Sequence, residues 1–264
     1  MIKRRSPKRD ELVDPARTIL WLNLLSVAVG SCRAGRVQRT VLAQGWGREV
    51  EKSSRFSLYS KGKCSPNKAM IALAEKFLPG TAYVIGHVLW DVLRENLDIS
   101  VHLWTWVERL PAEIQKAICS DDRKIEERVM TREMLLRRFG LDSLAALVIL
   151  FRLNVAGVTT NWDPATSLAG SAYGYAKAIL QTLVLMAADF PGDSAREAIF
   201  KLFVERIFRA DLVGGFPMID LETFDFSGRA EQLRFAAGEL GVTIAPPLSR
   251  VDFRVIERQI VPYL

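Results

Sequence analysis

Residues 56–66 read FSLYSKGKCSP and are followed by the apolar-periodic run NKAMIALAEKFL at residues 67–78. A helix is expected to end at Gly62, because glycine adopts a positive φ at a helix end without steric cost. A new helix is expected to begin at Ser65 and Pro66, with Ser65 as the N-cap and Pro66 as the first helical residue. The stretch therefore predicts two helices joined by a short basic turn.

A basic ridge is predicted on the helix expected just upstream, at residues 34–44. Arg33, Arg36 and Arg39 recur every three residues, and this spacing places them along one side of a helix. The apolar residues that begin at Val37 face another side. A basic ridge beside an apolar one is what a helix in contact with a phosphate backbone requires.

The net charge of +6 is unevenly distributed along the chain. Residues 1–70 hold 15 basic and 5 acidic side chains and so carry +10, which leaves −4 for the remaining residues. A basic segment on a mildly acidic body points toward nucleic acid or another anionic surface as a partner. A solvated basic face that serves only solubility is the alternative interpretation.

Four residues lie at the spacing apolar-x-x-aromatic-x-x-Gly-x-x-x-Pro: Phe56, Tyr59, Gly62 and Pro66. This pattern resembles the end of the recognition helix and the following turn in the Cro/repressor (XRE-type) helix-turn-helix family, and Leu73 lies near the family's next apolar pair. The resemblance covers about a fifth of the chain and is degenerate. Ser60 stands where the family has Glu, and residues 45–47 would have to form a lengthened turn.

The resemblance implies that the helix at 34–44 positions the motif and that a helix at 48–59 enters the major groove of double-stranded DNA by its N-terminal half. Base and phosphate contacts then come from Lys52, Ser53, Ser54 and Arg55. The turn and the next helix face phosphates through Lys61, Lys63 and Lys68. The remaining candidate DNA-binding residues are those of the basic ridge, Arg33, Arg36 and Arg39.

Composition sets the broad class of the protein. Of the 264 residues, 49% are hydrophobic and 25% are charged, which supports a large core and excludes intrinsic disorder. No apolar run approaches the roughly 20 residues of a membrane helix, so no membrane partner is expected. Cys32, Cys64 and Cys119 are odd in number and form no CxxC pair, which favours a reducing, cytoplasmic setting.

Helical patterns dominate and predict an all-α protein, with a small N-terminal helix-turn-helix-like domain followed by a larger helical domain. The expected division is a basic flexible arm at 1–15, a helix-turn-helix-like DNA-binding domain at 16–95, and a helical assembly or effector domain at 96–264. Short extended pieces are allowed at 155–160 and 242–245. Helices are expected at 16–30, 34–44, 48–59, 66–77, 81–95, 101–107, 111–119, 122–138, 142–154, 164–189, 193–210, 227–240 and 249–260.

The sequence offers little for catalysis. His87 and His102 are the only histidines, so a histidine-based triad or metal site is not expected, and His87 is interpreted as a satisfied core residue. The one acidic cluster that suits a divalent cation has apolar neighbours typical of a loop-to-helix junction; it consists of Asp220, Glu222 and Asp225. No glycine pattern matches a phosphate-binding loop. We therefore expect no enzyme, no cofactor and no metal.

The leading hypothesis is a cytoplasmic DNA-binding protein, a transcriptional regulator that contacts double-stranded DNA through a basic helix-turn-helix. Its C-terminal helical domain is expected to form a homodimer, bind another protein or bind a ligand. The alternative is a non-enzymatic helical adaptor or assembly subunit whose basic segment binds an acidic protein or RNA.

Overall fold

The computed structural model describes residues 9–43, 54–120, 124–125, 131–157, 172–187, 190–209, 224–245 and 248–259. Within these residues the protein is all-α, as predicted, and contains no β-strand. Backbone contacts divide the chain into two compact units, Met1–Gly86 and His87–Leu264, which we call the N-terminal and C-terminal units and describe one at a time. The expected domain boundary at residue 95 stays a prediction.

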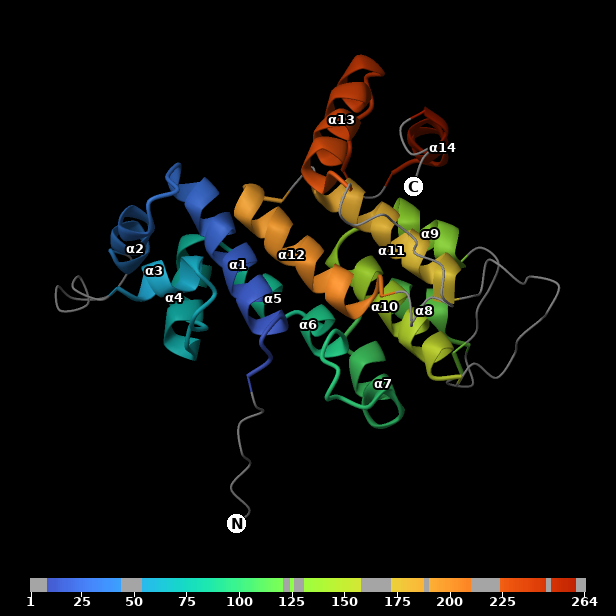
Figure 1. Ribbon diagram of the computed structural model, residues 1–264, viewed down its shortest axis with the longest axis horizontal. Helices are drawn as coiled ribbons and strands as arrows, with labels where there is room; N and C mark the ends of the chain where they lie inside the picture. The colour runs from blue at the N-terminus through green and yellow to red at the C-terminus, as the bar shows by residue number, and fades with distance from the viewer. Residues whose placement is uncertain are drawn as a thin grey trace, which may run out of the picture. The chain divides into compact units, whose positions relative to one another are not determined.

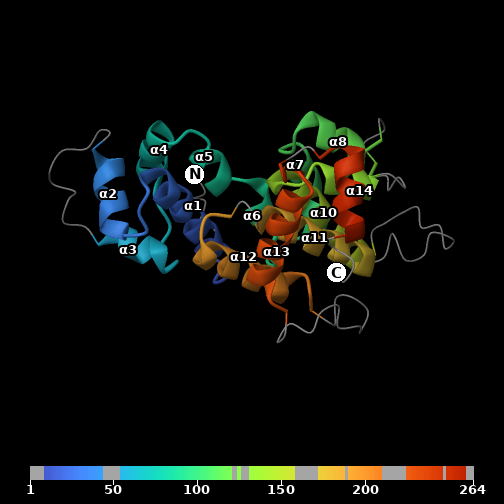
Figure 2. The same cartoon turned by 90° about the horizontal axis from the view of Figure 1, so that it is seen from above.

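The N-terminal unit is built from short helices packed around one longer helix. In Figures 1 and 2, α2 and α3 lie side by side, and both contact α1. Its helices are α1 (Val13–Val29), α2 (Ala34–Leu42), α3 (Arg55–Ser60), α4 (Lys68–Phe77) and α5 (Thr81–Ile85).

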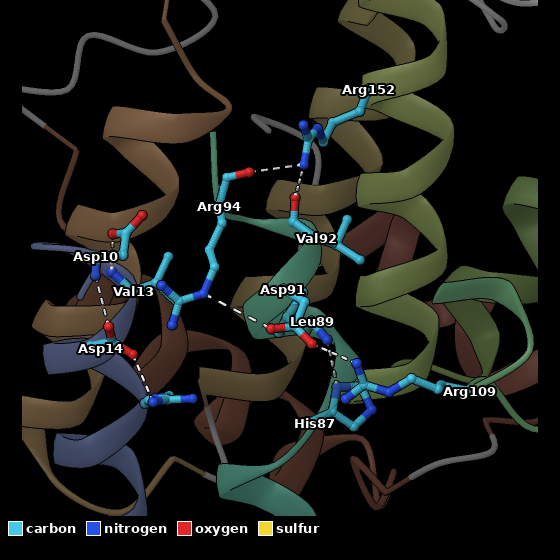
Figure 3. A network of polar contacts seen from close by, with 11 residues as sticks. Asp10, Val13, Asp14, His87, Leu89, Asp91, Val92, Arg94, Arg109 and Arg152 are labelled. Carbon is cyan, nitrogen blue, oxygen red and sulfur yellow. Dashed lines mark hydrogen bonds and ion pairs between the residues drawn. The ribbon is translucent and has the colours of Figure 1, made fainter. Parts of the chain in front are cut away.

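Two aspartates fix the start of α1 (Figure 3). The carboxylate of Asp10 accepts hydrogen bonds from the backbone N–H groups of Leu12 and Val13 at 3.0 and 2.9 Å, and the carboxylate of Asp14 accepts one from the N–H of Asp10 at 2.8 Å. These bonds satisfy N–H groups that a helix start leaves without a partner. The expected end at residue 30 is confirmed, because Gly30 is the C-cap with a φ of 65°, and the helix begins at residue 13 rather than 16.

A single apolar cluster joins the helices of the N-terminal unit. Trp21 of α1 meets Tyr59 of α3 edge-on, with 5.8 Å between ring centroids, and Phe56 lies 5.4 Å from Tyr59. Each of these three side chains is at most 2% exposed, so they form the centre of the core. The other buried members of the cluster are Leu22, Leu25, Val37, Val41, Leu42, Met70, Leu73, Ala74 and Ile85.

The C-terminal unit is arranged around α10, which is buried along almost its whole length from Ser143 to Leu153. It packs against α6, α7, α8, α9 and α11 (Figure 1). A helix that is apolar on every side belongs in the interior of a protein. The helices of this unit are α6 (Val88–Val92), α7 (Ile99–Val107), α8 (Ala112–Ile118), α9 (Thr131–Arg137), α10 (Leu141–Val155), α11 (Ala172–Ala187), α12 (Asp193–Arg206), α13 (Phe226–Glu239) and α14 (Arg250–Gln259).

His87 is a satisfied core residue, as predicted. Its Nδ1 accepts a hydrogen bond from the N–H of Leu89 at 3.1 Å and so caps α6, while its Nε2 lies 3.0 Å from the carboxylate of Asp142. Because Nδ1 is an acceptor, the ring proton sits on Nε2 and is donated to Asp142. The imidazole therefore ties the start of α6 to the start of α10.

The start of the helix at 66–77 was predicted wrongly. The N-cap is Asn67, whose side chain accepts a hydrogen bond from the N–H of Met70 at 2.9 Å, and the helix begins at Lys68. Pro66 is buried outside the helix, and Ser65 is exposed. The asparagine has an extended backbone, which is the conformation an N-cap requires, so the expected Ser65 cap is replaced by one two residues later.

Other boundaries also differ from the prediction. Ile125 forms an isolated antiparallel bridge with Cys119, so the expected helix at 122–138 does not extend through it and is described only as α9. The expected helix at 81–95 is divided into α5 and α6 around Gly86. Val155 is helical rather than extended, and residues 242–245 form no strand. The helix expected at 48–59 is wrong at Ser54, which is the non-helical N-cap of α3, and its residues 48–53 lie outside the described residues. The first part of the helix expected at 164–189 also lies outside them.

The two alternative N-caps of α4 are distinguished by a matched pair of alanine substitutions. Asn67→Ala removes the acceptor of the Met70 N–H and is expected to lower the free energy of unfolding by about 1 kcal/mol. Ser65→Ala touches no N-cap bond and is expected to change it by less than about 0.5 kcal/mol. Urea unfolding followed by circular dichroism measures both values. A larger loss for Ser65→Ala than for Asn67→Ala contradicts the assignment.

Glu75 gives the N-terminal unit an acid-sensitive contact. Hydrogen bonds from the backbone N–H groups of Ala82 and Gly80 hold the pKa of its carboxyl below the ordinary 4.5. A lowered pKa in the folded state stabilises the fold above pH 4.5, and this stabilisation is lost as the pH falls through the lower folded value. Glu75→Gln is therefore expected to destabilise the protein at neutral pH, with a difference from the wild type that shrinks below pH 4.5. Urea unfolding at a series of pH values measures that difference, and a constant value contradicts the prediction.

Candidate nucleic-acid interface

The four residues of the motif anchor α3 and the turn that follows it. Phe56 and Tyr59 are buried against Trp21 of α1, and Gly62 and Pro66 are also buried. Burial raises the pKa of the Tyr59 hydroxyl above its ordinary value, because a phenolate is poorly stabilised away from water. The motif residues therefore hold the backbone in place and leave surface contacts to the side chains between them.

The turn after α3 has a defined backbone geometry. The N–H of Lys63 donates to the carbonyl of Leu58 and the N–H of Gly62 donates to the carbonyl of Tyr59, both at 2.9 Å. This pair of bonds is the Schellman pattern, which requires a positive φ at its glycine, and Gly62 has a φ of 62°. The guanidinium of Arg9 donates to the carbonyls of Gly62 and Lys63. The turn is thus held by its own backbone hydrogen bonds and by the side chain of Arg9.

Gly62 also approaches α1 closely. A Cβ placed on Gly62 lies 2.6 Å from the Cβ of Pro15 and 2.9 Å from its Cα. Atoms at that distance overlap. Residue 62 must therefore be glycine for two reasons: a side chain would collide with Pro15, and the positive φ disfavours other residues. This contact sets how near the turn can come to α1.

The predicted basic ridge is exposed on α2. Arg33, Arg36 and Arg39 are exposed, whereas Val37 and Val41 are completely buried in the core cluster. The apolar side of α2 faces α1, α3 and α4, which it contacts. The arginines therefore lie on the side of the helix that faces away from that core.

The candidate residues of α3, the turn and α4 are exposed as well. They are Ser54, Arg55, Lys61, Lys63 and Lys68. Lys52 and Ser53, the other two candidates, lie outside the described residues. Because α2 and α3 pack against each other (Figure 2), the structure brings Arg55 and the α2 arginines onto neighbouring helices.

The carboxylates in the described part of the N-terminal unit make no ion pair with these cations. In the described part of this unit the acidic residues are Asp10, Glu11, Asp14 and Glu75. Three of them accept backbone hydrogen bonds at the starts of α1 and α5. Seven candidate cations make no ion pair within the described residues: Arg33, Arg36, Arg39, Arg55, Lys61, Lys63 and Lys68. They form an exposed positive surface, which we call the basic surface.

Sequence reasoning missed two residues that shape this region. Asn67 caps α4, and Arg9 holds the turn although it was assigned to a flexible arm. An extended Asn just before a helical run is a recognisable cap, but the Ser65-Pro66 pair competes with it in the sequence. The contact of Arg9 joins segments more than fifty residues apart, for which no local pattern exists.

The other candidate chemistry gains no support from the described residues. Asp225 accepts a hydrogen bond from the N–H of Gly228 at 2.8 Å and caps α13, while Asp220 and Glu222 lie outside the described residues. No group of three or more metal-ligating side chains occurs among the residues that the structure describes.

No family model, curated protein or solved structure matches this chain. No single helix in the described ranges combines the length and the hydropathy of a membrane span; α1 and α2 reach both only as a pair, across a bend of 76°.

A comparison of Gly62 with Gly30 separates two effects of an alanine substitution on stability: the strain of a positive φ and the steric overlap with Pro15. The two glycines have φ of 62° and 65°, but a Cβ at Gly30 meets no atom within 4 Å. Gly30→Ala is expected to lower the free energy of unfolding by about 1 kcal/mol through backbone strain alone. Gly62→Ala adds the overlap with Pro15 and is expected to lower it by about 2 to 4 kcal/mol. Chemical denaturation measures both, and equal losses contradict a packing role for Gly62.

Proposed function

We propose that the N-terminal unit binds double-stranded DNA through α2, α3 and the turn to α4, and that the protein acts as a DNA-binding regulator. The observation that carries the proposal is the basic surface, whose seven cations are exposed while the motif residues between them are buried. Exposed guanidinium and ammonium groups on neighbouring helices are suited to phosphates spaced along a duplex.

The arrangement assigns different roles to the two helices. Arg36 and Arg39 lie on the exposed side of α2 and Arg33 is its N-cap residue, which suits a helix that follows the phosphate backbone. Ser54 and Arg55, at the start of α3, are the described residues nearest the segment proposed to reach base edges. Lys61, Lys63 and Lys68 extend the positive surface beyond α3.

Rigidity of the turn supports the same function. The Schellman bonds, the Arg9 contacts and the close approach of Gly62 to Pro15 fix the backbone that displays Lys61 and Lys63. Cations on a fixed backbone lose less conformational entropy on binding than cations on a mobile loop. The C-terminal unit contributes a separate helical body, which we assign to assembly or to effector response.

Fluorescence anisotropy with labelled duplex DNA tests the proposal. Arg36→Glu with Arg39→Glu is expected to weaken binding by about tenfold or more at low salt, because two phosphate contacts become repulsive. The slope of log K against log salt is expected to become shallower by about 2, since about one counterion is released for each phosphate contact. Arg55→Glu is expected to weaken binding in the same direction.

The matched control is Arg229→Glu with Arg234→Glu, which reverses two exposed arginines on α13 and changes the net charge equally. This variant is expected to bind duplex DNA like the wild type at moderate salt. No binding of the wild type at low salt, or equal losses for the two double variants, contradicts the proposed interface. Tighter binding to single-stranded RNA than to duplex DNA would instead favour the adaptor function.

A further inference from the structure

A pocket of about 260 Å³ lies within the C-terminal unit. The ends of α6 and α12, the start of α7 and the last turns of α10 form its walls. At about 30 Å³ for each water-sized group, it holds roughly nine such groups, which is the size of a small organic molecule.

The lining combines an apolar floor with a positive rim. Phe151 and Ile207 are almost completely buried and supply apolar surface, and Val155 continues that surface to solvent. Four arginines and one glutamate line the pocket, and one of the arginines, Arg94, also lies 3.9 Å from Asp91 outside it; the five are Arg94, Arg152, Arg206, Arg209 and Glu95. A concave apolar surface with a few convergent charged groups is the usual form of a small-molecule site.

Arg152 is held rigidly at one side of the pocket (Figure 3). Its guanidinium donates to the carbonyls of Val92 at 2.5 Å, Arg94 at 3.2 Å and Leu97 at 2.7 Å, and it lies 5.2 Å from the ring centre of Trp106. Carbonyl groups satisfy the N–H donors but do not cancel the charge. No carboxylate lies within ion-pair distance of Arg152 in the described part of the chain, although Asp98 and Glu95 are near enough to raise its pKa, so its positive charge is only partly balanced.

The opposite side of the pocket already holds a carboxylate between two guanidinium groups. Glu95 lies 2.5 Å from Arg206 and 3.8 Å from Arg209. The Glu95 side chain is 58% exposed and that of Arg206 is 14% exposed, so the carboxylate side of the pair is open to solvent and to a competing carboxylate. The position of Glu95 shows that a carboxylate fits this pair of arginines.

We propose that this pocket binds a small apolar carboxylate, whose charged group takes the place of Glu95 beside Arg206 and Arg209 and whose hydrocarbon part lies against Phe151 and Ile207. Guanidinium groups match the planar geometry of a carboxylate with two parallel hydrogen bonds. The long-range field of Arg152 adds to this attraction, while the apolar floor favours a ligand with a hydrocarbon chain over an inorganic anion. The site lies within the C-terminal unit and does not depend on DNA binding.

Isothermal titration calorimetry of the full chain with octanoate, in the absence of DNA, tests the proposal. Octanoate carries one carboxylate, and its size is close to the roughly nine water-sized groups that the pocket holds. Its neutral analogue 1-octanol and inorganic phosphate are the two comparison probes. We expect octanoate to bind at least about tenfold more tightly than either, because each comparison probe lacks one half of the interaction. Equal affinity for octanoate and 1-octanol, or for octanoate and phosphate, overturns the proposal.

Two substitutions test whether octanoate binds in this pocket. Arg209→Gln removes a half-exposed guanidinium and is expected to weaken octanoate binding by about tenfold. Val155→Trp fills the open side of the pocket from a position that is 41% exposed, and it is expected to abolish binding without unfolding the protein. Arg234→Gln on α13 is the matched control and is expected to leave the affinity unchanged. Wild-type affinity in both pocket variants, or no octanoate binding by the wild type, contradicts the site.

Discussion

The arrangement of the N-terminal unit depends on the close contact between Gly62 and Pro15. Because no Cβ separates the turn from α1, the helix before it is drawn onto Trp21, and Phe56 and Tyr59 complete an aromatic cluster there. The same φ that permits the contact closes α3 with two backbone hydrogen bonds. A single glycine therefore determines where α3 ends, how it packs and which of its side chains remain on the surface.

Arginine plays a comparable role in the C-terminal unit, where the chain turns repeatedly between α6 and α7. These turns leave carbonyl groups without helical partners, and Arg152 of α10 binds three of them. Partial burial of the guanidinium lowers its pKa, yet arginine stays protonated because its ordinary pKa is very high. A lysine at this position has neither the planar fork to reach all three carbonyls nor the ring contact with Trp106. Arg152 therefore both binds the backbone carbonyls of this segment and supplies positive charge at one side of the pocket.

Local patterns in the sequence were sufficient where one residue type decides the structure. The helix ends at residue 30 and Gly62 and the helix at 142–154 were predicted, because a glycine that takes a positive φ and a continuous apolar run leave few alternatives. The separation of basic and apolar sides on α2 followed from the spacing of its arginines. Where two local signals compete, as for Ser65 and Asn67, the sequence did not decide the cap.

Two further features were not predicted from the sequence. Ile125 pairs with Cys119, six residues earlier, although the charge spacing around it is typical of a helix, because this short backbone bridge overrides helix propensity. The arginines that line the pocket come from three separate parts of the chain, so no local sequence motif predicts the pocket. The structure describes the exposure of the candidate DNA-binding residues from Ser54 onward and of Arg33, Arg36 and Arg39.

Charge composition alone does not explain why the cations of the N-terminal unit are available. The C-terminal unit is also rich in arginine, but there Arg109 pairs with Asp91, Arg137 with Glu133 and Arg138 with Glu113. In the N-terminal unit, Asp10 and Glu75 accept hydrogen bonds from backbone N–H groups, and Asp14 both accepts one and pairs with Arg17 on α1 itself. These three carboxylates are engaged at helix starts, and in the described residues none of them pairs with a cation of the basic surface. The positive surface therefore results from the way the helices are capped as much as from the number of basic residues.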